Sequence, residues 1–462
     1  MEESNTQIPN SQIPPEPGEK VFWGEALADF WLEDKNQNKI KVLKGVQVTG
    51  TQLFAPYDCV QLALKGISES DYYQATFGGK SYVQFNGGAL IECLGHSWTE
   101  TQSKWRPLRE PLDIAYNNTN GYEISFTLFS FPEFLGHHDI NLQDTKAETG
   151  GSYWWRCGQI PMEVDGWEIL ISGHIKTHEW IEEIRETGGW AATHIGAIRK
   201  SNFRPISWEE AKNLIKCLHN FLSFARGHWQ PIGNIRLLDS EKNCTREMWG
   251  LLPGGSQPNQ SGMTWWSPHP MGHELKDAFK GFWKIWNNPI WTEPLIEIIY
   301  WYLQANLGSR GQLGCDSALI LSQAALEKLA WIYITRSKEV VSEEDFASIK
   351  RASDKFRLLA THLEIPQEIP GIIESLKEDM EGNIFEDAFH AITDIRNQLV
   401  HPKRNRELKD RATFDAWNLS QWYIEMFLLR LMKYEGHYAN RIRIRKWAGE
   451  IDQVPWIKKD IG

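Results

Sequence analysis

Hydrophobic and polar residues alternate along much of the first half of the chain. Segments 39–50 and 121–131 have this period of two, which is typical of strands with one buried face. An Asn-Gly-Gly turn at 86–88 and an Asp-Gly turn at 165–166 can connect antiparallel neighbours. We therefore predict an antiparallel, β-rich domain over residues 19–227.

The first long helix is predicted to begin after Ser207 and to end near Gly227. The Ser207 hydroxyl and the Glu210 carboxylate have the spacing of a capping box. Gly, Pro, Asn and Ser are frequent in the residues that follow. We therefore predict a loop-rich connector at 228–293, with one short helix at 274–286.

The hydrophobic period changes to that of helices in the last third of the chain. A helix that is apolar on nearly every face is expected inside a bundle. The predicted helices cover residues 294–307, 317–334, 343–363, 386–400 and 413–434. The predicted fold class is α+β, with the β-rich domain followed by an all-α helical domain at 294–462.

Length and composition agree with a folded protein of two or three domains. The chain has 462 residues, of which 41% are hydrophobic and 23 are tryptophan, enough apolar surface for real cores. Residues 1–18 are polar and rich in proline, so we predict a disordered tail there. The tryptophan pairs at 154–155 and 265–266 are either core residues, which we favour, or exposed rings that bind a ligand.

The cysteine spacing, the N-terminal segment and the short length of the apolar runs predict a cytoplasmic protein. The six cysteines are scattered without a CxxC pair, which fits a reducing compartment and argues against a structural zinc site. The N-terminus lacks the features of a signal peptide, and no run of 18 apolar residues is present, so we expect no membrane association. Metal-ligand residue types occur at 136–139 and 174–179, but spacing places no third ligand. No phosphate-binding glycine motif is present either, so we expect no cofactor.

Positive charge is concentrated in two windows of an otherwise acidic chain. The net charge is −11, which argues against a non-specific nucleic-acid coat. Residues 396–411 nevertheless hold six lysines and arginines against two acidic residues, and residues 430–446 hold six against one. These windows predict a local polyanion site, although a solvated helix face or a dimer rim would have the same composition. The candidate RNA-binding residues are Lys403, Arg404, Arg406, Arg441, Arg443 and Arg445.

The segment Asp394-Ile-Arg-Asn-Gln-Leu-Val-His-Pro402 is the most informative string in the sequence. Pro402 should end the helix at His401. Arg396 and His401 then suit RNA phosphodiester cleavage, because imidazole moves protons near neutral pH and guanidinium stabilises phosphoryl charge. Spacing alone has little weight, since Arg357 and His362 have the same Arg-x4-His spacing inside another predicted helix.

The context of Arg396, Asn397 and His401 resembles the HEPN superfamily. That superfamily has Arg, a polar residue and a later His near the end of the penultimate helix of a small bundle. The upstream ALEKLA and the segment YEGHYANRIRIRKWAGEIDQVPW also resemble HEPN domains of bacterial anti-phage abortive-infection proteins. The resemblance covers roughly residues 295–456. It implies a homodimer with a composite active site and a phage-derived trigger.

The resemblance assigns roles to four residues. It implies that His401 is the general acid and base, that Arg396 stabilises the transition state and that Asn397 positions the phosphate or the imidazole. Glu327 lies in a helix that is apolar on nearly every face, where an unpaired carboxylate is costly. Glu327 is therefore expected either to orient Arg396 or to extend into solvent.

The predicted function is a metal-independent endoribonuclease that leaves 2′,3′-cyclic phosphate and 5′-hydroxyl ends and acts as a toxin in anti-phage defence, regulated by the β-rich domain. The alternative is a non-catalytic HEPN-like protein that dimerises or binds RNA and recognises a ligand through its aromatic β-rich domain.

Overall fold

The computed structural model describes residues 20–34, 36–53, 60–77, 79–117, 119–134, 138–139, 158–174, 176–252, 263–268, 272, 274–308, 314–381, 384–401, 411–443 and 449–457. The predicted tail at 1–18 lies outside these residues. The described chain has an N-terminal antiparallel β-rich region and a C-terminal helical region, so the α+β class is confirmed.

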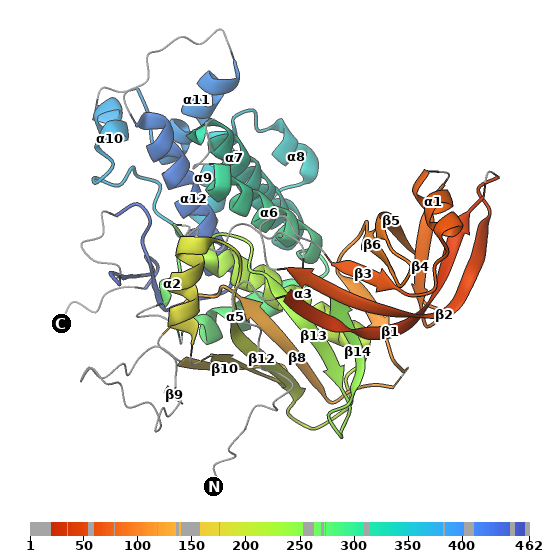
Figure 1. Ribbon diagram of the computed structural model, residues 1–462. Helices are drawn as coiled ribbons and strands as arrows, with labels where there is room; N and C mark the ends of the chain where they lie inside the picture. The colour runs from red at the N-terminus through yellow and green to blue at the C-terminus, as the bar shows by residue number, and fades with distance from the viewer. Residues whose placement is uncertain are drawn as a thin grey trace.

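The first part of the chain is a closed antiparallel barrel with strand order β1-β2-β3-β6-β5-β4 (Figure 1, right). Its strands are β1 (Lys20–Glu33), β2 (Lys39–Leu53), β3 (Gln61–Leu64), β4 (Ser81–Phe85), β5 (Ile91–Trp98) and β6 (Ser103–Pro107). Helix α1 (Glu69–Phe77) packs against β5. Asn86 and Gly87 follow β4 with positive φ angles of 45° and 74°, as the predicted turn requires.

An eight-stranded antiparallel sheet follows the barrel, with strand order β7-β14-β13-β8-β12-β11-β10-β9. Its strands are β7 (Leu112–Ala115), β8 (Glu123–Phe129), β9 (His138–Asp139), β10 (Gly158–Val164), β11 (Trp167–Gly173), β12 (Ala192–Lys200), β13 (Ile232–Leu238) and β14 (Cys244–Trp249). The predicted Asp165-Gly166 turn joins β10 to β11, and both residues have positive φ.

The prediction of a loop-rich connector at 228–293 is wrong for its first part. Strands β13 and β14 lie there, and β13 pairs with β8 near the middle of the sheet. Local composition hid them because their stability comes from pairing with strands more than 100 residues earlier. The β-rich region therefore extends to about Trp249 and consists of a barrel and a sheet.

Trp249 joins the barrel to the sheet. Its side chain is fully buried in the barrel core. A Cβ added at Gly50 would lie 2.4 Å from the Trp249 ring, and one at Gly24 would also contact this ring. The two glycines therefore make room for the indole between β1 and β2.

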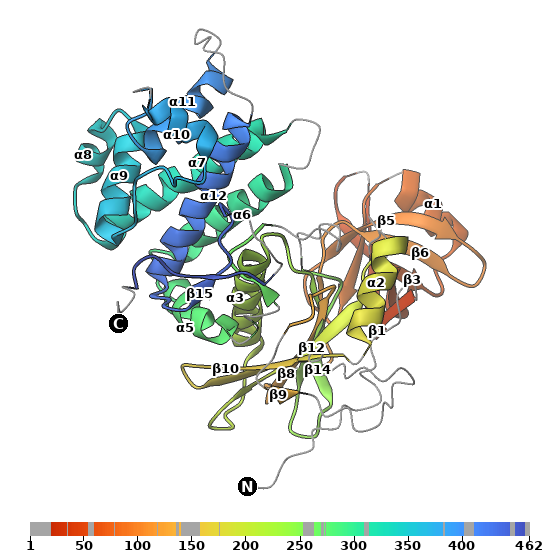
Figure 2. The same ribbon diagram turned by 90° about the vertical axis from the view of Figure 1, so that its left-hand side faces the viewer.

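Helices cover one face of the sheet and continue into the helical region (Figures 1 and 2). Helix α3 begins with the predicted Ser207–Glu210 capping box and ends at Gly227 in a left-handed conformation. The helices that contact the sheet are α2 (Thr177–Thr187), α3 (Trp208–Arg226) and α5 (Glu274–Trp286), and α6 (Thr292–Gly308) packs on α3, α5 and α7.

The rest of the described chain is almost entirely helical. The helices are α7 (Cys315–Trp331), the π-helix η2 (Ile332–Ser337), α8 (Glu343–Ser348), α9 (Ala352–Leu363), α10 (Glu374–Glu381), α11 (Ala388–Val400) and α12 (Ala412–Leu431). Two short strands, β15 (His437–Tyr438) and β16 (Asp452–Gln453), pair after α12. The single helix predicted at 343–363 is two helices, since the backbone is extended at Ile349 and Arg351.

One hydrophobic core runs from the sheet through α3, α5 and α6 into the later helices. Trp265 and Trp266 are both buried in it, which confirms the core interpretation for this pair; Trp154 and Trp155 lie outside the described residues. No helix among the described residues has the length and hydropathy needed to cross a bilayer.

Candidate functional site

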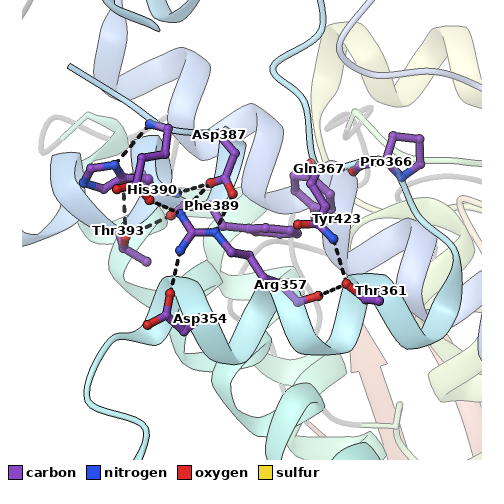
Figure 3. Close-up of polar contacts among 11 residues, drawn as sticks. Asp354, Arg357, Thr361, Pro366, Gln367, Asp387, Phe389, His390, Thr393 and Tyr423 are labelled. Carbon is purple, nitrogen blue, oxygen red and sulfur yellow. Dashed lines mark hydrogen bonds and ion pairs between the residues drawn. The ribbon is translucent and has the colours of Figure 1, made fainter. Parts of the chain in front are cut away.

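Helix α11, which carries the Arg396–His401 segment, is anchored at its first residue by α9. Asp387 caps α11 by accepting a hydrogen bond of 2.8 Å from the His390 backbone N–H. Arg357 of α9 donates to Asp387 and also pairs with Asp354 and Glu386 (Figure 3). The hydrogen bonds from Arg357 to Asp387 are the largest of the causes that raise the pKa of this guanidinium.

The loop before α11 is held to the same anchor. The Ala388 N–H donates to the Gln367 carbonyl at 3.0 Å, and the Gln367 amide donates to Thr361 Oγ1 at 2.9 Å. Tyr423 of α12 donates to the Pro366 carbonyl at 2.9 Å and contacts the Phe389 ring (Figure 3). The start of α11 is therefore fixed by α9, α12 and the intervening loop.

The other end of α11 follows the prediction. The helix ends at Val400, and His401 has φ −115° and ψ 105°, an extended conformation. Its backbone N–H still donates to the Asn397 carbonyl at 3.0 Å, while its side chain is exposed. The imidazole therefore lies beyond the last helical turn, where a substrate can reach it.

Arg396 and Asn397 are joined in the last turns of α11. The Arg396 Nη1 donates to the Asn397 Oδ1 at 3.3 Å. No ion pair links Arg396 to a carboxylate of the described chain, and its buried Nε has no hydrogen-bond partner there. A guanidinium in this state keeps its donors for a phosphate oxygen. No contact joins Arg396 to His401 within the same residues.

Two further polar residues of α11 belong to this end of the helix. The Gln398 amide donates to Asp394 Oδ2 at 2.8 Å, whereas the buried Gln398 Oε1 finds no partner among the described residues. The sequence analysis gave neither residue a role, although both lie inside the segment that carries the HEPN resemblance.

Of the two alternatives for Glu327, the orientation of Arg396 is wrong and the extension into solvent is confirmed. Helices α7 and α11 do pack together, but Glu327 is exposed and accepts a hydrogen bond of 2.8 Å from the Gln323 amide on its own helix. No ion pair joins it to Arg396 in the described part of the chain. The apolar pattern of α7 leaves a narrow solvent-facing stripe, and Glu327 lies on that stripe.

The assignment of Arg441 to RNA binding is also wrong. Its side chain and that of Glu425 are both fully buried, with 3.5 Å between Arg441 Nε and Glu425 Oε1. Arg441 also donates to Asn306 at 2.9 Å, and Tyr302 donates to Glu425 at 2.6 Å. Burial and the Glu425 charge raise the pKa of Tyr302 well above its ordinary value. Arg441 therefore neutralises a carboxylate in the core. The sequence contained a signal for this pair, because Glu425 lies within the apolar sequence of α12 and requires a cationic partner.

Arg443 is half exposed but already paired. Its terminal nitrogens lie 2.9 Å from Glu450 and 2.6 Å from Asp452, which neutralise most of its charge toward a polyanion. The other candidate RNA-binding residues lie outside the described residues; these are Lys403, Arg404, Arg406 and Arg445.

The metal-ligand residue types noted in the sequence have other contacts. His174 stacks on Trp180 with ring centroids 4.4 Å apart, and His178 pairs with Glu133 at 3.2 Å. Within the described ranges, no group of three or more His, Cys, Asp or Glu residues is arranged to hold a metal ion.

These observations define an α+β protein in which a barrel and an antiparallel sheet precede a helical region. At the end of α11 lie an exposed histidine and an arginine that has no carboxylate partner among the described residues. Comparison with known proteins gives two matches to domain families. Residues 117–253 match the YopA central domain, and residues 288–454 match the YopA C-terminal domain. The first match covers strands β8 to β14, and the second covers α6 to the end of the described helical region.

The chain is also similar to the SPbeta prophage-derived uncharacterized protein YopA of Bacillus subtilis (strain 168). The two are 25% identical over 355 residues, which cover 76% of this chain and 75% of that protein. No solved structure gives a significant match.

Proposed function

We propose that the protein is a metal-independent endoribonuclease of the HEPN type, with its helical region forming a HEPN-like bundle and its active site at the end of α11. The observation that carries this proposal is the state of Arg396. This guanidinium is hydrogen-bonded to Asn397 and lacks a carboxylate partner among the described residues, five positions before an exposed His401. An arginine without a counter-charge among the described residues, on the same helix end as an exposed imidazole, suits a phosphodiester substrate.

The chemistry uses groups of this chain and of RNA. An imidazole removes the proton of the RNA 2′-hydroxyl, and the 2′-oxygen forms a bond to the adjacent phosphorus. The bond between phosphorus and the 5′-oxygen breaks, and a protonated imidazole gives its proton to the leaving oxygen. Arg396 stabilises negative charge on the phosphoryl oxygens. The products carry a 2′,3′-cyclic phosphate and a 5′-hydroxyl.

The reaction needs one imidazole as the base and a second, protonated imidazole as the acid. Each chain supplies only His401 at this site. A homodimer in which two α11 helices face one cleft supplies the second His401. The unsatisfied Arg396 Nε can donate to a phosphate oxygen, and the unsatisfied Gln398 Oε1 can accept from a donor on a partner surface. The proposed active unit is therefore a dimer.

One protein that this chain resembles is named as prophage-derived, and this supports a role connected with phage. We infer that cleavage acts as a toxin during phage infection, released when the β-rich region meets a phage-derived trigger.

The test is RNA cleavage by the purified full chain, with end-group analysis of the products. Wild type is expected to cut total RNA equally well with and without EDTA, and His401→Ala is expected not to cut. Inhibition by EDTA, or cleavage by His401→Ala at the wild-type rate, would overturn the mechanism. If wild type is silent until triggered, its expression should still slow bacterial growth under phage challenge, whereas His401→Ala should not.

A second candidate function is favoured by Glu327. Because this carboxylate contacts Gln323 and not Arg396, the helical region lacks one expected catalytic contact and suits a non-catalytic RNA-binding protein as well. RNA binding that depends on Arg396, without cleavage and without growth arrest, would support this alternative.

A further inference from the structure

A cavity of about 430 Å³ lies far from the end of α11, between α5, η2 and the last turn of α12. Both views of the fold show α5 beside the lower end of α12 (Figures 1 and 2). Phe389 near the start of α11 contacts Phe427 near the end of α12, so these helices run antiparallel and Arg396 lies toward the start of α12. At 1.5 Å per residue, seven residues of α11 and five of α12 separate Arg396 from the cavity by about 18 Å along the helices.

Four lysines line this cavity together with one carboxylate. The lining lysines are Lys280, Lys284, Lys338 and Lys433, and the carboxylate is Asp277. All five side chains belong to exposed residues. None of them forms a salt bridge with another residue of the described chain. The cavity therefore presents a net formal charge of about three positive units.

The ends of three helices reduce this charge without cancelling it. The C-termini of α5, η2 and α12 all border the cavity, and each contributes about half a negative charge. Four lysines against one aspartate and about one and a half charges from the helix ends leave a positive field. The favourable interaction of lysines with helix C-termini therefore explains only part of the positive charge at the cavity.

Three departures from regular helical structure meet at the cavity. Gly281 is inside α5, where glycine is less favourable than alanine. A Cβ there would lie 2.0 Å from the Met432 carbonyl oxygen at the end of α12. Glycine is thus needed for α5 to approach α12. The wall opposite is η2, a π-helix, a form that is frequent at functional sites.

The third departure is Lys433. It follows the end of α12 with φ 55°, and the Tyr434 N–H donates to the Leu429 carbonyl at 3.0 Å. This is the closing turn in which glycine is the usual residue. A lysine at this position is strained, and its exposed side chain reaches the cavity. Replacement of Lys433 by glycine would relieve this backbone strain, so such a variant removes the ammonium group without a cost in folding.

We infer that this cavity binds a small molecule that carries at least two phosphate groups. Its volume is that of a small-ligand pocket, and four lysines that line one cavity match a polyphosphate better than a single anion. Trp291 and Tyr333 form its apolar wall; the Trp291 indole is fixed by a hydrogen bond of 3.0 Å to Ser337. Because α5 also donates from Trp283 to Asp165 of the β10–β11 turn, the ligand would strengthen the contact between the sheet and the helical region.

The experiment is calorimetric titration of the full chain with inorganic tripolyphosphate and with ATP, alongside thermal unfolding. Wild type is expected to bind tripolyphosphate at least ten times more tightly than orthophosphate and to unfold several degrees higher in its presence. Lys433→Gly is the decisive variant: it relieves the strained backbone, so it should fold at least as stably as wild type while binding at least ten times more weakly. Lys216→Ala and Lys350→Ala, which remove exposed lysines elsewhere, should bind as wild type does.

Equal tripolyphosphate binding by Lys433→Gly and wild type would overturn the inference, as would an equal loss in the two control variants. Binding of a ten-nucleotide RNA that depends on Lys433, without binding of tripolyphosphate, would show a nucleic-acid surface instead. His401→Ala should bind tripolyphosphate normally, so failure of the proposed nuclease and failure of this site are distinguishable.

Discussion

Two segments of the helical region share the spacing Arg-x4-His and differ in what surrounds the arginine. Arg357 is held by carboxylates of Asp354, Glu386 and Asp387, whereas Arg396 has a neutral partner, Asn397. Arg357 has a structural role, because its ion pairs fix the start of α11. Arg396 has no counter-charge among the described residues. Charge compensation, which spacing cannot reveal, separates a structural arginine from a candidate functional one.

The histidines differ in backbone position. His362 lies within the last turn of α9, which ends at Leu363, and five residues along a helix place it about 140° from Arg357. His401 lies past the end of α11 in an extended conformation, so its direction is released from the helical period. Both side chains are exposed, which makes His362 a matched control for His401.

The largest expected effect is the difference between these two histidines. His401→Ala should lower the RNA cleavage rate by about 100-fold to 10,000-fold, the range for loss of a general acid or base. His362→Ala should cleave at the wild-type rate, because this imidazole is remote from Arg396. The single-turnover cleavage rates of the two variants test this difference. Equal rates would mean that the two histidines do not differ in function.

The next effect is at the arginines. Arg396→Ala should lower cleavage by about 100-fold to 1,000-fold through loss of transition-state stabilisation. It should leave the unfolding temperature near that of wild type, because no ion pair of the described chain is broken. Arg396→Lys should recover little, since an ammonium group lacks the planar fork of guanidinium. A large decrease in the unfolding temperature of Arg396→Ala, in parallel with its activity, would instead mean that Arg396 is a structural residue.

Arg357→Ala should show the reverse behaviour. Its side chain is 23% exposed, and its removal leaves Asp387 and its neighbours without a counter-charge, which should cost about 2 kcal/mol of the free energy of unfolding. Cleavage per folded molecule should stay close to wild type. Urea unfolding and cleavage at a temperature where both variants are folded separate the two quantities. A cleavage defect in fully folded Arg357→Ala would mean that both segments act in catalysis.

The sequence correctly predicted the helix ends and turns that depend on neighbouring residues. Ser207 with Glu210 gave the start of α3, Asp165 with Gly166 gave the β10–β11 turn, and Pro402 gave the end of α11. Strand β13 was missed because its partner β8 is more than 100 residues earlier in the chain. Closure of the first six strands into a barrel was missed because it depends on β1 pairing with β4, which are not consecutive in sequence.

The candidate site shows the same division. The His401 backbone follows from Pro402, so its exposure beyond the helix could be expected. The partners of Glu327 and Arg441 could not, because each depends on which stripe of a helix faces the core. Glu425 and Arg441 are 16 residues apart in sequence and meet only through the packing of α12 against the chain that follows it. The cavity lysines escaped notice because they come from three separate segments.

Glu327 provides the smallest effect and the sharpest test of the comparison. Its carboxylate is exposed and contacts the Gln323 amide, so Glu327→Gln should change stability by less than about 0.5 kcal/mol. If Arg396 works without a carboxylate, as its contacts in this structure indicate, cleavage should fall by less than about threefold, a transition-state change of under about 0.7 kcal/mol. Steady-state cleavage by Glu327→Gln beside Arg396→Ala measures this. A loss as large as that of Arg396→Ala would mean that Glu327 reaches Arg396 in the active dimer. Arg396 would then require a carboxylate just as Arg357 does.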